Sequence, residues 1–250
     1  MSAATIKQET PVLISYEDLV AFSNDTADEA LRSDLVAKIG QAFGPDGLGL
    51  IGVQNVPDFA EKRERLLRLG HALPYADDIK DCELPDALYS TGWSHGREQL
   101  APGRPDWAKG SFYANPWQDS LVEYLSQRDG RSEYWKRQAE QFPEFYADNV
   151  WPASMMPHIR DAFMELGQCM MQVGGMVAKV CDEYCATAKE GVQTSFYKTL
   201  TESRNSKGRY VMRMQASIWL RTIDELILCK HGNRHIPDAM ISTIQATALF

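Results

Sequence analysis

Residues 47–58 constrain the fold of this chain more than any other stretch. Their centre, residues 48–53, is a short apolar run with β-branched residues, and turn-forming sequences flank it at residues 44–47 and 54–58. A short apolar run between turn sequences is typical of a buried strand. Helical patterns lie on both sides of it, so the sequence predicts a helix–strand–helix unit.

The helix before this strand begins at Thr26-Ala-Asp-Glu29, which has the pattern of a capping box. Its apolar residues recur at steps of four and form a single stripe, namely Leu31, Leu35, Ile39 and Phe43. Gly44-Pro45 ends the helix. Further upstream, the apolar segment at residues 11–14 begins with proline, as edge strands can.

Residues 85–117 differ in composition from the rest of the chain. They combine four glycines and four prolines with six large aromatic residues, Tyr89, Trp93, Trp107, Phe112, Tyr113 and Trp117. A long irregular segment in a compact domain is usually functional or disordered, and the aromatic content argues against disorder. We therefore expect an ordered loop with one or two short strands.

The strongest helical pattern begins at Pro157. Its apolar residues alternate steps of four and three, at Ile159, Phe163, Leu166, Met170, Val173, Val177, Val180 and Tyr184. A coiled coil would show the same pattern, but Gly174-Gly175 favours a central helix in a globular core, where glycine allows a neighbour to approach closely. Shorter helices are predicted at residues 118–128 and 133–142 and between Pro143 and Pro152. A strand is predicted at residues 209–214, and a weakly amphipathic helix is predicted at 215–228.

The composition narrows the class of partner. With 34 acidic against 26 basic residues and a formal net charge of −8, we expect neither a nucleic acid nor an anionic membrane as partner. No apolar stretch reaches the roughly 20 residues of a membrane span, and the first ten residues lack the features of a secretory signal. The five cysteines are irregularly spaced, at Cys82, Cys169, Cys181, Cys185 and Cys229, which favours a reduced, cytoplasmic protein.

One cluster has the residue types of a metal site, His231-x-x-x-His235-x-x-Asp238. Two histidines four residues apart share one face of a helix, and a carboxylate three residues further on can join them. Gly232-Asn233 and Pro237 interrupt a helix at this point, so the sequence favours an ordinary surface segment over a metal site.

The other candidate residues are more simply explained as structural residues than as members of a functional site. Cys181 and Cys185 lie on the long helix without a second cysteine pair, so we interpret them as buried thiols. His71 and His158 have no partner motif. The spacing Gly47-x-Gly49-x-x-Gly52 matches a dinucleotide fingerprint, but these glycines flank and interrupt the strand instead of following it.

The order of these segments resembles the N-terminal region of the isopenicillin-N-synthase-like, 2-oxoglutarate- and iron(II)-dependent oxygenases. In that family, an apolar strand similar to residues 11–14 and a helix precede a segment that usually reads Gly-Phe-Phe-x-Val-x-Asn-His-Gly. Residues 49–57 are similar to this segment, with Leu50-Ile51 for the phenylalanines and Val56-Pro57 for His-Gly.

Further similar segments follow in the order of the family. They are the helix end at Leu73-Pro74, the acidic-lysine stretch at residues 77–80, the glycine-aromatic segment of the active-site mouth at 89–94, the approach to the barrel at 111–116, the spine helix from Pro157, and the entry into the double-stranded β-helix at 206–213. The resemblance implies an α+β protein with a mostly helical N-terminal region, a few short strands and only the start of a jelly roll. It also implies three parts: a loose N-terminus (1–10), a dioxygenase N-terminal-like region (11–205), and the first barrel strand with a divergent tail (206–250).

The chain departs from the family after Arg213. The family carries His-x-Asp, a distal histidine and Arg-x-Ser in the barrel, where they bind Fe(II) and 2-oxoglutarate. No such motifs follow Arg213, and residues 214–250 are too few for the missing strands. We therefore expect a truncated and catalytically incomplete form, with no catalytic, cofactor-binding or metal residue assigned and with neither cofactor bound by this chain alone.

Two functions follow from this interpretation. A full-length family member would oxidise a small-molecule substrate with Fe(II), 2-oxoglutarate and oxygen. The alternative is a non-catalytic interaction or regulatory module, in which a protein partner covers the apolar stripe of the long helix that a barrel would otherwise cover.

Overall fold

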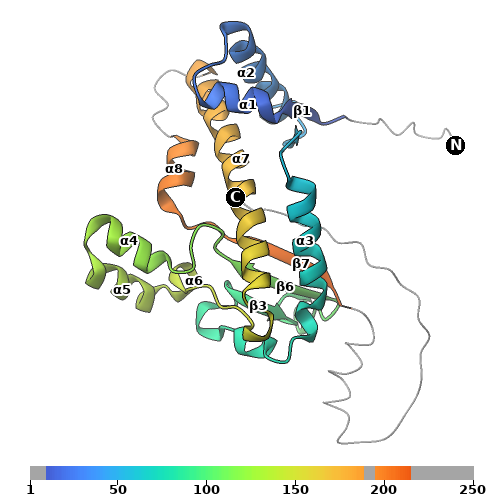
Figure 1. Cartoon of the computed structure of the whole chain (residues 1–250), viewed down its shortest axis with the longest axis vertical. Coiled ribbons are helices and arrows are strands. Elements are labelled where there is room, and N and C mark those ends of the chain that lie inside the picture. The colour runs from blue at the N-terminus through green and yellow to red at the C-terminus, as the bar shows by residue number, and fades with distance from the viewer. Residues whose placement is uncertain (1–9, 189–194, 215–250) are drawn as a thin grey trace, which may run out of the picture. The chain divides into compact units, whose positions relative to one another are not determined.

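The computed structural model describes residues 10–188 and 195–214 (Figure 1). These residues form an α+β protein in which helices are combined with a few short strands in small sheets. The chain divides into two compact units: unit one contains the described residues up to Phe59 and those of Cys169–Ser203, and unit two contains those of Ala60–Gln168 and Arg204–Phe250. Within the described ranges, every helix is too short or too polar to cross a membrane.

Unit one is built around a parallel pair of strands. In chain order its elements are β1 (Val12–Ser15), α1 (Tyr16–Ser23), α2 (Glu29–Phe43), β2 (Ile51–Gln54), the later turns of α7 (His158–Ala188) and α8 (Phe196–Ser203). Val12 lies opposite Ile51, and Ser15 lies opposite Gln54. Parallel strands need a long connection, and α1 and α2 together supply it.

The core of unit one lies on one face of this strand pair. Its buried residues come from β1, α1, α2 and α7 and are Ile14, Leu19, Phe22, Leu35, Ile39 and Val180. Ile51 and Val53 of β2 pack against the same cluster. The apolar run at residues 48–53 was predicted to be a buried strand, but the strand begins only at Ile51 and is half-buried, while Leu48 and Leu50 before it are exposed.

The glycines of residues 44–49 form the turn between α2 and β2. The Gly49 N–H donates to the Ala42 carbonyl at 2.9 Å, and the Gly47 N–H donates to the Gly44 carbonyl at 2.9 Å. A Cβ on Gly47 would lie 2.3 Å from the Ala42 carbonyl oxygen, so only glycine fits there. This spacing of glycines is therefore explained by chain reversal.

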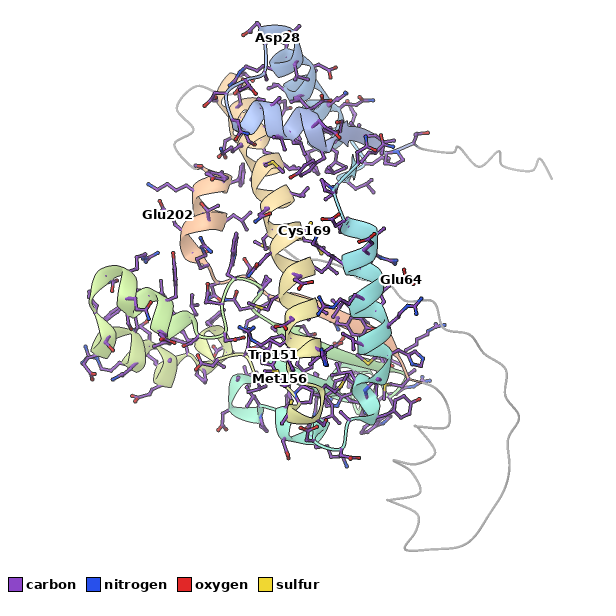
Figure 2. The ribbon with its side chains drawn as sticks, in the orientation of Figure 1. Asp28, Glu64, Trp151, Met156, Cys169 and Glu202 are labelled. Atoms are coloured by element: carbon purple, nitrogen blue, oxygen red, sulfur yellow. The ribbon has the colours of Figure 1, made fainter. Side chains whose placement is uncertain are left out.

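The predicted cap of α2 is wrong by two residues. Asp28, at the N-terminal end of α2 in Figure 2, accepts a hydrogen bond from the Leu31 N–H at 2.9 Å. Thr26 instead closes the preceding helix, because both its N–H and its hydroxyl donate to the Ala21 carbonyl. The sequence contains two good capping residues, and only the path of the chain decides between them.

Unit two combines helices with two small antiparallel sheets. Its helices are most of α3 (Phe59–Ala72), α4 (Leu121–Asp129), α5 (Ser132–Gln141), α6 (Pro143–Tyr146), the first turns of α7, and 3₁₀ turns at Leu73–Tyr75, Ile79–Cys82, Pro85–Ala87 and Ala153–Met155. Its strands are β3 (Gly92–His95), β4 (Gln99–Ala101), β5 (Arg104–Pro105), β6 (Lys109–Ala114) and β7 (Gly208–Arg213). Strands β4 and β5 form a hairpin, and the larger sheet has the order β3-β6-β7.

The larger sheet has one aromatic face. Trp93, Phe112 and Tyr210 lie opposite one another on the three strands and are all buried. Phe112 contacts the rings of Trp151 and Phe163, with centroids 5.5 and 6.3 Å away. This face therefore packs against α7 and the segment before it, which leaves the opposite face to polar residues.

Residues 85–117 are more regular than predicted. They contain all of β3, β4, β5 and β6, where one or two strands were expected. The strands are short and glycines interrupt their alternation, so the period-two pattern is weak in the sequence. The aromatic residues Trp93 and Phe112 become core residues once β3 and β6 pair.

The stripe of the long helix is partly covered. Ile159, Phe163 and Leu166 are buried in the first turns of α7, and Val180 is buried near its end. Met170, Val173 and Val177 are half-buried. Because described residues already bury both ends of the stripe, the surface left for a protein partner is smaller than the sequence suggests.

Candidate functional site

The second face of the β3–β6–β7 sheet carries polar side chains. Side chains alternate between faces along a strand, so the neighbours of Phe112 and Tyr210 lie on this face. We call its polar members the polar face: Ser94 of β3, Lys109, Ser111 and Tyr113 of β6, and Arg209 and Arg213 of β7. The side chains of Ser94 and Ser111 are buried although both are polar.

Glu98, from the segment between β3 and β4, binds to the polar face. Lys109 Nζ donates to Glu98 Oε2, and Arg209 Nη2 donates to Glu98 Oε1. The Tyr113 hydroxyl also donates to Oε1, at 3.5 Å. A single carboxylate thus accepts hydrogen bonds from three side chains on two strands.

The orientation of Arg209 is fixed by its neighbours. Its Nε and Nη2 donate to Ser111 Oγ at 3.2 and 2.9 Å, and its Cζ lies 5.1 Å from the centre of the Tyr113 ring. Only 18% of its side chain is exposed. A planar guanidinium held in this way presents its remaining donors in one fixed direction, as recognition of a carboxylate requires.

The protonation states of the polar face suit anion recognition. Burial acts to raise the pKa of Glu98, but the hydrogen bond from Lys109 and the charge of Arg209 outweigh it and lower that pKa. Burial raises the pKa of Tyr113. At neutral pH the carboxylate is therefore ionised and the phenol keeps the proton that it donates.

A second polar cluster lies where the three strands begin or end. Lys207, just before β7, donates from Nζ to Oγ1 of Thr91, which is fully buried just before β3. No carboxylate pairs with Lys207 among the described residues, and burial lowers its pKa to about 8. Asn115, just after β6, donates to the Arg204 carbonyl at 2.7 Å. These two contacts connect the segment before β7 to the start of β3 and to the end of β6.

A shallow groove runs along α4, α5 and α6. Its lining includes Glu123, Lys136, Glu140 and Tyr146. Ser126, which also lines it, has a buried Oγ with no hydrogen-bond partner among the described residues. Because the charged lining residues lie on exposed helices and do not converge on one point, the polar face is the better candidate site.

The thiols and histidines predicted to be ordinary do not converge on a site. Cys181 and Cys185 lie on α7 as free thiols, and burial raises the pKa of Cys181 to about 11, so that thiol is a poor nucleophile at neutral pH. His71 lies near the end of α3, and His158 begins α7. Cys229 lies outside the described residues.

The metal-ligand pattern of His231, His235 and Asp238 also lies outside the described residues, so it stays a prediction. Metal analysis of the wild-type chain against His235→Ala tests it. Within residues 10–188 and 195–214, no three histidine, cysteine or acidic side chains gather into a group that could hold a metal ion.

The sequence alone does not indicate the polar face. Alternation at residues 209–213 predicts a strand, but it does not reveal which strand lies beside it. Glu98 and Arg209 are separated by 111 positions in the sequence. One signal was present, since the polar residues Lys109, Ser111 and Tyr113 alternate with Gly110 and Phe112.

Comparison with protein-family models finds no match, and no curated protein matches this chain. The oxygenase resemblance of residues 11–213 therefore stays a prediction.

Proposed function

We propose that this chain corresponds to the N-terminal, largely helical part of an isopenicillin-N-synthase-like oxygenase, and that it does not turn over 2-oxoglutarate by itself. One observation carries the proposal. The two segments that resemble the approach to the barrel and the entry into it, residues 111–116 and 206–213, contain strands that pair with each other, with Phe112 opposite Tyr210. If both segments belong to the start of one barrel, their strands should lie side by side, and β6 and β7 do so.

The parallel pair in unit one gives further support. Residues 11–14 and 49–57 each resemble a segment of the family, and they overlap β1 and β2, which pair with Ile14 opposite Val53. A helical crossover joins them, as the order strand–helix–strand of the resemblance implies. The long helix α7 corresponds in the same proposal to the spine helix.

The sequence of this chain lacks the His-x-Asp motif of the family's iron site. That site needs two imidazoles and one carboxylate on one side of the metal. The sequence contains five histidines, and none of them has an aspartate or a glutamate two positions further on. We therefore derive no reaction step through iron, and we propose that these residues support and shape a site rather than perform oxidation.

Succinate formation tests the inactivity. We expect the 250-residue chain, supplied with Fe(II), ascorbate and 2-oxoglutarate, to form no more succinate than a reaction from which iron is omitted. Turnover above that background would contradict the claim of inactivity. A known oxygenase in the same buffer provides the positive control.

The nucleotide sequence after the codon for Met214 tests the family assignment. We expect another reading frame or exon there to encode His-x-Asp. If no frame encodes a metal-binding motif, the oxygenase assignment loses its main support, whereas the succinate result would be unaffected.

An interaction module is the second candidate, and unit one supplies an observation in its favour. Leu13 of β1 and Leu50 just before β2 are 44% and 50% exposed, and Phe43 at the end of α2 is 42% exposed. Large apolar side chains that are exposed in one unit can form a patch of the kind that marks a protein contact. A monodisperse, monomeric chain in a sizing experiment would count strongly against this candidate.

A further inference from the structure

The carboxylate of Glu98 occupies a cradle of donors that belongs to the sheet. Lys109 and Tyr113 project from β6, and Arg209 projects from β7. Both oxygens are used, since Oε1 accepts from Arg209 and Tyr113 while Oε2 accepts from Lys109. We call Lys109, Tyr113 and Arg209, with Ser111 orienting the guanidinium, the cradle.

The cradle holds more positive charge than Glu98 neutralises. Arg213 lies directly opposite Lys109 across the β6–β7 pair, and it has no ion pair among the described residues. Like charges directly opposite each other on two strands are unfavourable. Lys109 and Arg209 therefore bring two positive charges to one carboxylate, and the exposed Arg213 lies beside Lys109 on the same side of the sheet, so a second anionic group would be attracted.

The donors are better fixed than the acceptor. The side chain of Arg209 is 18% exposed, whereas that of Glu98 is 42% exposed. Glu98 lies in a connecting segment, and the neighbouring strand β4 is exposed along its whole length. The Glu98 backbone carbonyl accepts from the Asp106 N–H at 2.8 Å, so the side chain can swing out while its backbone stays in place.

We propose that the cradle binds the carboxylate of a small organic acid, and that Glu98 is an internal carboxylate which this ligand displaces. A ligand carboxylate at the position of the Glu98 carboxylate would accept the same hydrogen bonds from Arg209, Tyr113 and Lys109. Glu98 would then lie in solvent as a free anion. The proposal does not depend on the oxygenase assignment, because every residue that it uses is described and none binds iron.

The chemistry of the cradle favours a carboxylate over phosphate. The group that fills it is planar and has two oxygens, and a fixed guanidinium with a lysine on the other oxygen matches that shape. The Tyr113 hydroxyl adds one donor to the oxygen shared with Arg209. A tetrahedral dianion lacks this planar two-oxygen shape, so the cradle should hold it less well.

Emptying the cradle tests the proposal. In the full chain, Glu98→Ala removes the internal competitor, and propionate has the carboxylate and carbon chain of the whole glutamate side chain, one carbon more than the variant loses. We expect propionate to bind Glu98→Ala at least tenfold more tightly than the wild type in titration calorimetry. Propionate should also raise the melting temperature of the variant more than that of the wild type.

A matched control separates the cradle from an ordinary ion pair. Glu165 is 47% exposed and pairs with Arg65 at 2.5 Å on another part of unit two. Glu165→Ala should gain no propionate binding. Adding Arg209→Met to Glu98→Ala should abolish the gain, because the main donor to the carboxylate is then missing.

Three results would overturn the proposal. The first is equal propionate binding by Glu98→Ala and the wild type, and the second is an equal gain in Glu165→Ala. The third is stabilisation of Glu98→Ala by phosphate at the same ionic strength to the same degree as by propionate. If Glu98→Ala does not fold, Glu98→Gln keeps the shape and removes the charge, and the same comparisons decide the outcome.

Discussion

The α-carbon of Gly70 in α3 lies against the ring of Tyr210 in β7. A Cβ on Gly70 would lie 2.3 Å from Tyr210 Cζ, well inside van der Waals contact. The ring cannot easily move away, because it is 3% exposed and its hydroxyl donates to the Leu67 carbonyl at 3.3 Å. This contact joins a helix predicted from local pattern to a strand predicted nearly 140 positions later, at residues 209–214.

Gly70→Ala should destabilise the chain despite the better helix propensity of alanine. Overpacking typically costs about 1–3 kcal/mol, which exceeds the roughly 1 kcal/mol gained by replacing glycine in a helix. Gly175→Ala is the matched control, since its Cβ would lie 3.6 Å from Tyr197 Cε2, an ordinary contact. Urea unfolding should show a lower free energy of unfolding for the first variant and an equal or higher one for the second. Stabilisation by both would show that Tyr210 has room.

Asp119 should make the chain sensitive to acid. Its carboxylate accepts from Trp151 Nε1 at 3.0 Å, Asn149 Nδ2 at 3.1 Å and Arg160 Nε at 2.7 Å. Burial acts to raise the pKa of Asp119, but these hydrogen bonds lower it overall. Because the folded-state pKa is the lower one, the stabilisation is complete above the unfolded pKa of about 4 and is lost as the pH falls through the folded value.

Asp119→Asn therefore should lower the free energy of unfolding at pH 7 by about 1–2 kcal/mol, which is less than a fully buried hydrogen bond to a charged group contributes because the Asp119 side chain is 38% exposed. The difference from the wild type should shrink as the pH is lowered from 5 to 2. Asp34→Asn, which breaks an exposed pair with Lys38, should cost about 0.5 kcal/mol or less. A difference for Asp119→Asn that stays constant with pH would contradict the assignment.

Lys207 should make the free energy of unfolding rise with pH, whereas a lysine in an ion pair makes it fall as the pH rises. Burial lowers its pKa to about 8 in the folded chain, against about 10.4 for an unfolded lysine. Between these values the unfolded state binds more protons, so the free energy of unfolding rises with pH. Lys207→Met should flatten this rise between pH 8 and 10. An unchanged slope would show that the amine is better solvated than its contact with Thr91 indicates.

Asp182 should hold the N-terminus of α8. Its carboxylate accepts from the N–H groups of Phe196 and Tyr197 at 2.6 and 3.2 Å and from the Ser195 hydroxyl at 2.6 Å. Asp182→Ala should cost about 1–2 kcal/mol, as the loss of a good helix cap does. The neighbouring Glu183→Ala, which breaks the pair with Arg32, should cost about 1 kcal/mol or less in the same urea series. Equal losses in the two variants would mean that the hydrogen bonds from α8 to Asp182 stabilise the chain no more than the Arg32–Glu183 ion pair does.

Most of the long helices were predictable from the sequence, and so were some of the strands. The stripe from Leu31 to Phe43 and the one that begins at Ile159 repeat over a few residues, so the pattern is visible without knowledge of the fold. The strand at residues 209–214 was visible by alternation, as β7 confirms. The helix α8 and the hairpin of β4 and β5 were not predicted, because their short segments carry no clear period.

The candidate site was the least predictable part. Glu98, Lys109 and Arg209 are ordinary charged residues in the sequence, without a motif that links them. Their meeting depends on the register that sets Tyr113 opposite Arg209 and on the path of the segment that carries Glu98. A shift of one residue in that register would turn Arg209 towards the aromatic core.

The sequence by itself determined the long helix α7 and the turn between α2 and β2, because periodicity and turn chemistry act over a few residues. Tertiary structure alone decided that Asp28 rather than Thr26 caps α2, that β6 lies between β3 and β7, and that Glu98 meets Arg209. These outcomes depend on contacts between residues far apart in the chain. Such contacts depend on side-chain packing and on strand register, and neither produces a local pattern in the sequence.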